Sequence, residues 1–502
     1  MTARRWTLLL AALIAGALLA GCDAAGPPEA DVTVRVGAPV SGLRAIPPGF
    51  VGVSMEFQSA ALVAGPASDP NTVVQQLLAG LAPGQAPVIR IGGDSTDHAW
   101  YPAPGLHDPD RHAFPITRAW LASLRTLADA IHARMLLGIN LEANNPRLSA
   151  VEARALVNGI GRGSIQGLEV GNEPSLYAAL YWYETASGQK VFGRPPGWDA
   201  AQYLAQFAAV ARRLPRSVPL AGPALGSHTF MAEVLGALLR SQPRLTTITY
   251  HSYPLNRCFT PPSAPTYPTI AHLLSPSSSR GLAAGDRSYA RAALAHGDVF
   301  RVDELNSVAC SGKTGVSNTF ASALWMLDTL FAMAREGVTG VNVHTLPSAA
   351  YRLFTVHRSA GRWSATVAPE YYALLAFTRA APPGSRLLGA AASGSPQVRV
   401  WATAGPGRTI RIVLINVSAN RSHVVRVTPS GADGPAGLQR LTAPGLTATG
   451  GVSLGGRRFA HFSSTGRLAA PQRRTVVRTS GGYVIRLPQA SAALLTIPVT
   501  SR

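Results

Sequence analysis

Hydrophobic and polar positions between residues 50 and 380 alternate in a regular way. Short apolar runs that end in polar residues are separated by longer stretches with apolar positions three or four residues apart. Runs of the first kind are typical of strands buried on both faces, and the longer stretches of amphipathic helices. The runs cover eight segments: 50–55, 88–91, 135–139, 167–170, 219–221, 246–250, 299–302 and 340–343.

This succession predicts an α/β fold in which helices surround a parallel sheet. The helical pattern is clearest over 120–133, 201–214, 230–239 and 319–334. Eight strand–helix units favour closure into a TIM, or (β/α)8, barrel that spans residues 45–380. An open, doubly wound sheet is the alternative, but no glycine-rich phosphate-binding turn follows the first run.

The helical pattern ends after residue 380. Segments rich in alternating apolar and β-branched residues follow, with Gly, Pro and Ser between them: 397–403, 409–417, 422–427, 474–479, 482–487 and 492–497. We expect a C-terminal all-β sandwich domain over 381–502, joined by a strand within 31–44 that precedes the barrel. Such a domain either binds carbohydrate or covers the flank of the barrel, and we favour the second role.

The first 21 residues are typical of an export signal. Arg4 and Arg5 precede an apolar segment, 8–20, and the tetrapeptide LAGC ends at Cys22. The tetrapeptide resembles a bacterial lipobox, which implies cleavage before Cys22 and a lipid on its thiol, with 22–30 as a tether. The alternative is secretion without a lipid. We expect an exported, extracytoplasmic lipoprotein that contacts the membrane only through this anchor.

The remaining cysteines and the net charge refine this picture. With Cys22 assigned to the lipid, Cys258 and Cys310 remain, and we expect a disulfide between them rather than two buried thiols. The formal charge is +20, but the chain has only two lysines and its arginines are scattered. Neither a basic helix stripe nor access to a genome supports a nucleic-acid partner, and an acidic glycan suits the charge better.

Two glutamates stand where barrel strands are expected to end. Glu173 lies in GNEP (171–174) after the fourth run, and Glu304 in DELNS (303–307) after the seventh. Glycosidic bond cleavage requires a proton donor for the leaving oxygen and a carboxylate at the anomeric carbon. We assign the acid/base role to Glu173 and the nucleophilic role to Glu304. Strand alternation should turn the adjacent Asp303 away from the barrel mouth.

Neighbouring polar residues support this assignment. Tyr253, after the sixth run, is a candidate hydrogen-bond donor that keeps Glu304 ionised. Asn172 can donate to the sugar 2-hydroxyl, a contact that strengthens in the transition state. No metal-ligand spacing follows His251, and neither a metal nor a cofactor is expected.

Several motifs, in order along the chain, resemble glycoside hydrolase family 79 of clan A, which contains β-glucuronidases and heparanases. They are VIRIGGDS (88–95), GNEP, YHSY (250–253) and ELNS (304–307), followed by the β domain. The resemblance implies a retaining, β-glucuronidase-like enzyme whose substrate is a carbohydrate. It places Glu173 and Glu304 in the catalytic roles, and Glu56, Asn172 and Tyr253 near the sugar.

One departure from the family pattern concerns the uronic carboxylate. Glucuronidases of the family place a tyrosine five residues after the nucleophile, whereas this chain has Ala309 there. We expect the Cys258–Cys310 disulfide to bring backbone N–H groups, Ser311 and either Arg257 or Lys313 to the carboxylate instead. Two alternatives remain: a clan A exo-glycosidase for a neutral sugar, and a catalytically inactive glycan-binding lipoprotein.

Overall fold

The computed structural model describes residues 29–432 and 434–499. The expected signal, Cys22 and most of the tether lie outside these residues. Within the described part of the chain, no helix combines the length and apolar character that crossing a bilayer requires.

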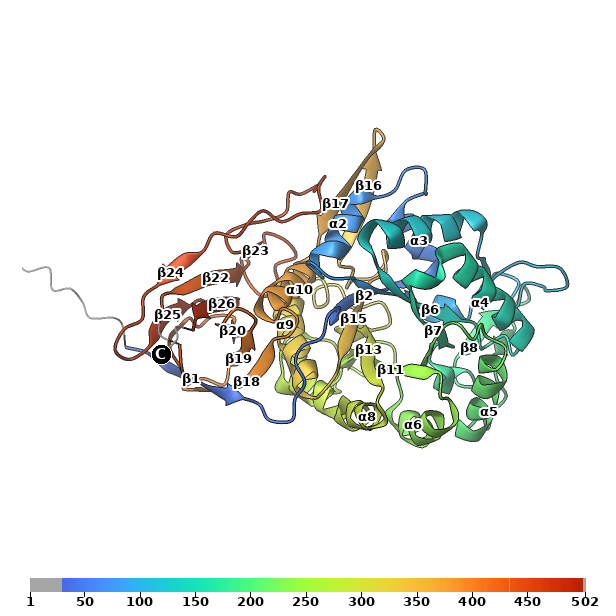
Figure 1. The fold of residues 1–502 in the computed structure, drawn as a ribbon, viewed down its shortest axis with the longest axis horizontal. Helices are drawn as coiled ribbons and strands as arrows, with labels where there is room; N and C mark the ends of the chain where they lie inside the picture. Colours follow the sequence, from blue (N-terminus) through green and yellow to red (C-terminus); the bar gives the residue numbers. More distant parts are fainter. Residues whose placement is uncertain (1–28, 433, 500–502) are drawn as a thin grey trace, which may run out of the picture.

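Eight parallel strands close into a barrel, which confirms the predicted fold class (Figure 1). Each overlaps one of the eight apolar runs, and most of them extend the run at its carboxyl end. The strands are β2 (Val51–Glu56), β3 (Val88–Gly92), β6 (Arg134–Ile139), β7 (Ile165–Val170), β10 (Leu220–Leu225), β11 (Leu245–Ser252), β13 (Val299–Leu305) and β15 (Gly340–His344).

Helices surround the barrel, and most of them bury one apolar face. Local capping sets their starts: the Thr117 hydroxyl accepts a bond from the Trp120 N–H, and Asp199 and Gln202 form a capping box. The helices are α1 (Phe57–Ala64), α2 (Thr72–Gly80), α3 (Arg118–Ile131), α4 (Pro146–Ile160), α5 (Ala200–Ala211), α6 (His228–Ser241), α7 (Ile270–Leu273), α8 (Leu282–His296), α9 (Phe320–Arg335) and α10 (Pro369–Ala380).

Pairs of short strands follow the carboxyl ends of barrel strands. They lie in the loops that connect a barrel strand to the next helix of the chain. The pairs are β4 (Ala99–Trp100) with β5 (Phe114–Pro115), β8 (Tyr181–Glu184) with β9 (Lys190–Phe192), β12 (Leu255–Asn256) with β14 (Val308–Ala309), and β16 (Phe354–Ser359) with β17 (Arg362–Val367).

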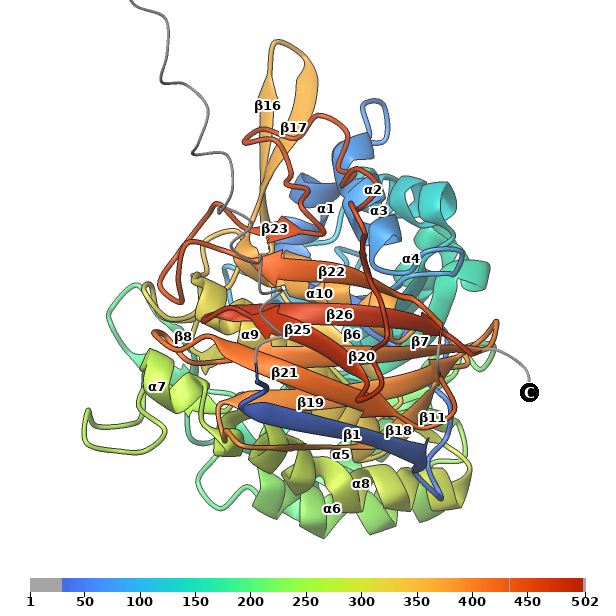
Figure 2. The same cartoon turned by 90° about the vertical axis from the view of Figure 1, so that its left-hand side faces the viewer.

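The C-terminal domain is a β structure of two layers (Figure 2). The strand β18 belongs to both, because it pairs with β1 in one layer and with β19 in the other. A separate apolar core fills the space between the layers. The strands are β1 (Val32–Pro39), β18 (Arg386–Ser393), β19 (Val398–Gly405), β20 (Thr409–Asn416), β21 (His423–Pro429), β22 (Ala436–Thr442), β23 (Ser453–Leu454), β24 (Arg474–Val476), β25 (Tyr483–Leu487) and β26 (Ser491–Pro498).

Sequence patterns missed three of these strands: β18, β22 and the two-residue β23. β18 reads RLLGAAAS and β22 reads AGLQRLT, and Ala and Gly have low strand propensity. Hydrogen bonds to partner strands stabilise β18 despite its low strand propensity. It lies between β19 and β1, and β1 comes from the other end of the chain.

The helix α9 joins the barrel to the β domain. Its side chains are buried all round except at Arg335, as a helix between two packed layers requires. Asp328 on α9 accepts bonds from the Trp401 indole at 2.7 Å and forms an ion pair with Arg399 at 2.6 Å. Phe331 stacks on Trp401, with ring centroids 5.7 Å apart. The β domain therefore covers the flank of the barrel through a buried polar and aromatic contact.

Candidate active site

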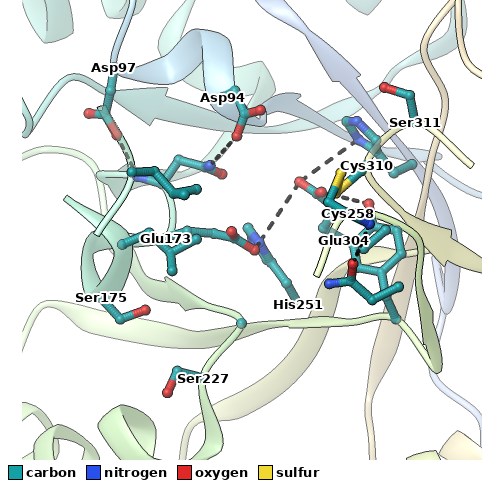
Figure 3. A pocket seen from close by; sticks show the side chains of 18 of the residues that line it. Asp94, Asp97, Glu173, Ser175, Ser227, His251, Cys258, Glu304, Cys310 and Ser311 are labelled. Carbon is teal, nitrogen blue, oxygen red and sulfur yellow. Dashed lines mark hydrogen bonds and ion pairs between the residues drawn. A yellow bond between two sulfur atoms is a disulfide. The ribbon is translucent and has the colours of Figure 1, made fainter. Parts of the chain in front are cut away.

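A cavity of about 680 Å³ opens at the carboxyl ends of the barrel strands (Figure 3). Each strand, or the loop that follows it, contributes at least one lining residue: Glu56, Asp94, Glu142, Glu173, Ser227, His251, Glu304 and His344. Parallel strands bring their carboxyl ends to the same face, so residues far apart in sequence meet there.

Glu173 occupies a strained position directly after β7. Its φ is +44°, in the left-handed region that residues other than glycine rarely adopt. The backbone N–H of Glu173 donates to the Ala224 carbonyl at 2.8 Å, which holds the turn. Gly226 leaves space for the carboxylate, because a Cβ there would lie 2.8 Å from Oε1 of Glu173. The strain turns the side chain into the cavity, where it is 25% exposed.

Glu304 lies near the end of β13 and is held by two donors. The Tyr253 hydroxyl donates to Oε1 at 2.6 Å, and Nη1 of Arg90 donates to Oε2 at 2.7 Å. Burial alone would raise the pKa of Glu304, but nearby His344, His251 and Arg90 hold it well below its usual value. Glu304 is therefore a carboxylate at neutral pH.

Arg90, fully buried on β3, connects the two glutamates. Its Nη2 lies 3.3 Å from Nε2 of His251, and because a guanidinium only donates, Nε2 is the acceptor. Nδ1 of the imidazole therefore carries the proton and donates to Oε1 of Glu173 at 2.9 Å. The same Nδ1 lies 3.9 Å from Oε2 of Glu304.

These contacts limit the separation of the two carboxylates. Oε1 of Glu173 and Oε2 of Glu304 lie 2.9 Å and 3.9 Å from the same nitrogen, Nδ1 of His251. The separation of these two oxygens therefore cannot exceed the sum of the two distances. That upper limit includes the roughly 5–5.5 Å spacing of retaining glycosidases and excludes most of the roughly 6.5–9.5 Å range of inverting ones. Glu173 and Glu304 can thus act on a single sugar carbon.

Asp303 lies beneath the cavity, inside the barrel. It is fully buried and forms an ion pair with Nε of Arg90 at 2.9 Å, beside Glu169 at 2.6 Å. Burial and Glu169 raise the pKa of Asp303, whereas Arg90 outweighs burial and lowers that of Glu169. A register shift in β13 next to β15 lets consecutive residues Asp303 and Glu304 contact the same guanidinium. As expected, the Asp303 side chain does not point to the mouth of the barrel. It points instead to Arg90 in the barrel interior.

Polar groups from β2, β3 and β15 line the opposite wall. The Ser95 N–H donates to Oε2 of Glu56 at 2.9 Å, and Nε2 of His344 lies 3.5 Å from Oε1. Gly93 permits this approach, since a Cβ there would lie 2.1 Å from Glu56. Burial by itself would lower the pKa of His344, but the Glu304 and Glu56 carboxylates raise it.

Asn172 and Asp94 complete that wall. Oδ1 of Asn172 accepts from Arg90 at 2.9 Å, which turns its amide nitrogen toward Oδ1 of Asp94, 3.4 Å away. Although Asp94 is exposed at the cavity surface, desolvation within the cavity and the surrounding carboxylates Glu56, Glu173 and Glu304 raise its pKa to about 7. Asp94 therefore changes protonation near neutral pH while facing the cavity.

The expected disulfide is present: Cys258 and Cys310 are bonded, with Cα atoms 6.3 Å apart, and line the cavity with Ser311. Arg257 is placed differently from the expectation. Its exposed side chain donates to the Gly312 carbonyl at 3.1 Å and is not among the lining residues. Its neighbours in the chain, Asn256 and Cys258, line the cavity, whereas Arg257 lies at the surface beside the loop to which the disulfide joins Cys258.

The lining includes polar and aromatic residues that were not predicted from the sequence, among them His98, Glu142, Trp182 and Tyr351. Tyr351 follows β15 and lies beside the Ser311 loop, where the Ala350 N–H donates to the Ser311 carbonyl at 2.8 Å. Burial raises the pKa of Tyr351, so the phenol stays neutral. The signal that the sequence offers for Tyr351 is an aromatic residue shortly after the last barrel strand. Many core residues share this feature, so it does not indicate a functional site. Within the described ranges, no group of three His, Cys, Asp or Glu residues is suited to hold a metal ion.

Comparison with known proteins finds glycoside hydrolases. Residues 400–494 match the glycosyl hydrolase family 79 C-terminal beta domain. A β-glucuronidase of Neurospora crassa is 25% identical over 415 residues, 74% of this chain and 72% of its own length. A β-glucuronidase of Aspergillus niger is 23% identical over 516 residues, 89% of this chain and 90% of its own.

Solved structures share the fold at lower identity. A 4-O-α-L-rhamnosyl-β-D-glucuronidase of Fusarium oxysporum is 20% identical, with a TM-score of 0.73 over 92% of this chain and 100% of its own. A family 51 arabinofuranosidase of Xanthomonas axonopodis pv. citri is 15% identical, with a TM-score of 0.61 over 93% and 100%. With its closed barrel, its paired glutamates and a C-terminal segment that matches the family 79 beta domain, this chain is a glycoside hydrolase similar to the fungal β-glucuronidases.

Proposed function

We propose that the protein hydrolyses β-glucuronides with retention of anomeric configuration. The observation that carries the proposal is the pair Glu173 and Glu304, both within 4 Å of Nδ1 of His251 and both directed into one cavity. The fungal relatives, named as β-glucuronidases, support the choice of glycone.

The reaction follows from the two environments. The Glu304 carboxylate attacks the anomeric carbon and forms a glycosyl ester, while Glu173 gives its proton to the departing oxygen, which leaves as an alcohol. Glu173, now a carboxylate, takes a proton from water, and the resulting hydroxide attacks the same carbon and releases Glu304. Tyr253 and Arg90 support both steps, because they hold the Glu304 oxygens in place.

The uronic carboxylate requires donors at the end of the cavity near Glu304. We assign this contact to Ser311 and Tyr351, which lie on adjacent loops that line the cavity. Both are neutral, so they bind a carboxylate through hydrogen bonds rather than ion pairs. Tyr351 supplies the phenol that the sequence lacks at Ala309.

A substrate series tests the glycone. We expect 4-nitrophenyl β-glucuronide to have the highest kcat/KM among the glucuronide, glucoside, galactoside and arabinoside. The Tyr351→Phe variant should lose about 10–100-fold in kcat/KM on the glucuronide, because a hydrogen bond to a charged group is lost, and little on the glucoside. A neutral glycoside preferred by the wild type, or equal losses on both substrates, would contradict the assignment.

A neutral sugar is the second candidate, and one observation favours it. Neither Lys nor Arg occurs among the described residues that line the cavity, whereas several carboxyl groups do. A uronate is repelled by such a lining unless Asp94 is protonated, which its pKa of about 7 permits only in part at neutral pH. The same substrate series separates the two candidates.

We further propose export and lipid attachment at Cys22, supported only by the LAGC sequence and the apolar segment before it. The fungal relatives lend this bacterial type of anchor no support. In a bacterial host, radiolabelled glycerol should be incorporated into the wild-type protein and not into Cys22→Ser, which should leave the membrane fraction. Equal labelling of both proteins would refute the anchor.

A further inference from the structure

The β domain carries most of the positive charge of the protein. Residues 381–502 contain fifteen arginines, no lysine and a single acidic residue, Asp433, so their formal charge is +14. The whole chain has +20, which leaves only +6 for the first 380 residues. A surplus of this size on one domain attracts polyanions. The catalytic reaction at the barrel mouth makes no use of it.

Three arginines gather where the end of α10 meets the layer that contains β20 and β22 (Figure 2). Nη1 of Arg379, in the last turn of α10, donates to the side chain of Gln439 on β22 at 3.1 Å. Arg411 on β20 and Gly437 on β22 occupy the same row of the sheet, because both pair with one residue of β26. Arg473 covers Gly437, where a Cβ would lie 3.7 Å from its Cδ. We name Arg379, Arg411 and Arg473 the arginine cluster.

The arginine cluster has no acidic partner in the described part of the chain. None of its three members forms an ion pair there, in contrast to Arg399 of the same domain. Burial and the charge of Arg473 lower the pKa of both Arg379 and Arg411. On the opposite face of β22, burial and Arg474 lower the pKa of Arg440 in the same way. Cations held close together at this cost are expected where an anion joins them.

Two unpartnered donors lie together at the cluster. Nη1 of Arg411 is buried and has no hydrogen-bond partner among the described residues. The same holds for the hydroxyl of Ser385, a residue that is fully buried. A Cβ at Gly405 would lie 2.0 Å from Nη1 of Arg411 and 3.3 Å from Oγ of Ser385, so the two atoms are close to each other. Both can donate, and an oxyanion would satisfy both.

We propose that the arginine cluster binds the carboxylate or sulfate groups of an acidic polysaccharide. The planar fork of N–H donors of an arginine matches such groups in pairs. Cations that extend over several strands fit a series of acidic groups on one polymer better than a single inorganic ion. The relatives of this chain act on glycosides, which favours a polysaccharide over a nucleic acid or a lipid surface. No member of the cluster lines the catalytic cavity, so the inference does not depend on the sugar that the cavity accepts.

Binding measurements on the full chain test this site. The probes are polygalacturonate, which carries carboxylates alone, heparin, which also carries sulfates, and neutral dextran. We expect the wild type to bind the acidic polymers and not dextran; binding of heparin alone would identify sulfate as the recognised group. The double variant Arg411→Gln/Arg473→Gln should bind about tenfold more weakly or worse, because charge-assisted hydrogen bonds are lost. Its Tm without polymer should not fall, since the substitutions relieve repulsion, whereas a purely structural role predicts a lower Tm.

The matched control is Arg35→Gln/Arg486→Gln, which removes the same charge from two exposed positions in the other layer of the β domain. It should change the affinity by less than about twofold, since separated surface charges are screened by salt. Equal losses in the two double variants would show a response to net charge alone and overturn the site. Tighter binding of duplex DNA or of phosphatidylglycerol vesicles than of either acidic polysaccharide would overturn it as well. A wild type that does not hydrolyse glucuronides refutes the proposed function and leaves this binding result in force.

Discussion

Replacing Glu304 by glutamine should lower kcat on the best glycoside by on the order of 10⁴-fold or more, while the protein remains folded. An amide cannot form the glycosyl ester, so the covalent route is closed. The fold should survive because the amide has the same shape, its oxygen can accept from Arg90, and Tyr253 can accept from its nitrogen. Initial rates and thermal unfolding of the purified variant are the measurements.

Azide separates the roles of the two glutamates. With Glu304→Ala, azide enters the vacated space and should form the glycosyl azide of inverted configuration. With Glu173→Ala, the ester at Glu304 still forms from an activated aryl glycoside, and azide should yield the retained product. Glu184→Gln, at an exposed glutamate of β8, is the control. Wild-type-like activity of Glu304→Gln, or exchanged product configurations, would contradict the assignment.

Replacing Arg90 by methionine should reduce both stability and activity. Arg90 contacts Glu169, Asp303 and Glu304 within 2.9 Å, and removing it leaves these buried carboxyls without their cation. We expect the free energy of unfolding to fall by about 3–5 kcal/mol at neutral pH. Because Glu304 also loses one of its two positioning donors, kcat should fall by roughly 10²–10³-fold.

The pH dependence of this loss has a definite sign. In the wild type, Arg90 holds the pKa values of Glu169 and Glu304 below their usual values, so their contribution to stability is present at neutral pH and is lost as the pH falls. In Arg90→Met these carboxyls can take up protons, so the stability difference between variant and wild type should shrink toward acidic pH. Urea unfolding at neutral and mildly acidic pH measures it.

Arg301→Met provides the comparison. Arg301 is also buried in the barrel, but it donates to the Gly49 carbonyl at 3.1 Å, at the end opposite the cavity. The Arg301→Met variant should be less stable than the wild type, but its kcat should stay near the wild-type value. A stable, fully active Arg90→Met would show that Arg90 neither neutralises nor positions the carboxyl cluster.

Much of the fold could be predicted because its signals are local. Strands buried on both faces produce continuous apolar runs, and eight of them separated by helical patterns indicate a closed barrel. The same logic located Glu173 and Glu304, since polar residues that follow such runs must lie at the barrel mouth. Strands β18 and β22, poor in strand-forming residues, carried no such local signal.

Chain order and residue type therefore determined the barrel, the β domain and the two acidic side chains at the carboxyl ends of β7 and β13. Only the tertiary structure decided what surrounds them: that Arg90 joins Glu304 to His251, that Tyr351 lies beside Ser311, and that Arg257 points outward. The reason is physical. Periodicity reports which face of an element is buried, but contacts between loops from different strands depend on register, backbone strain and packing, which no local pattern encodes.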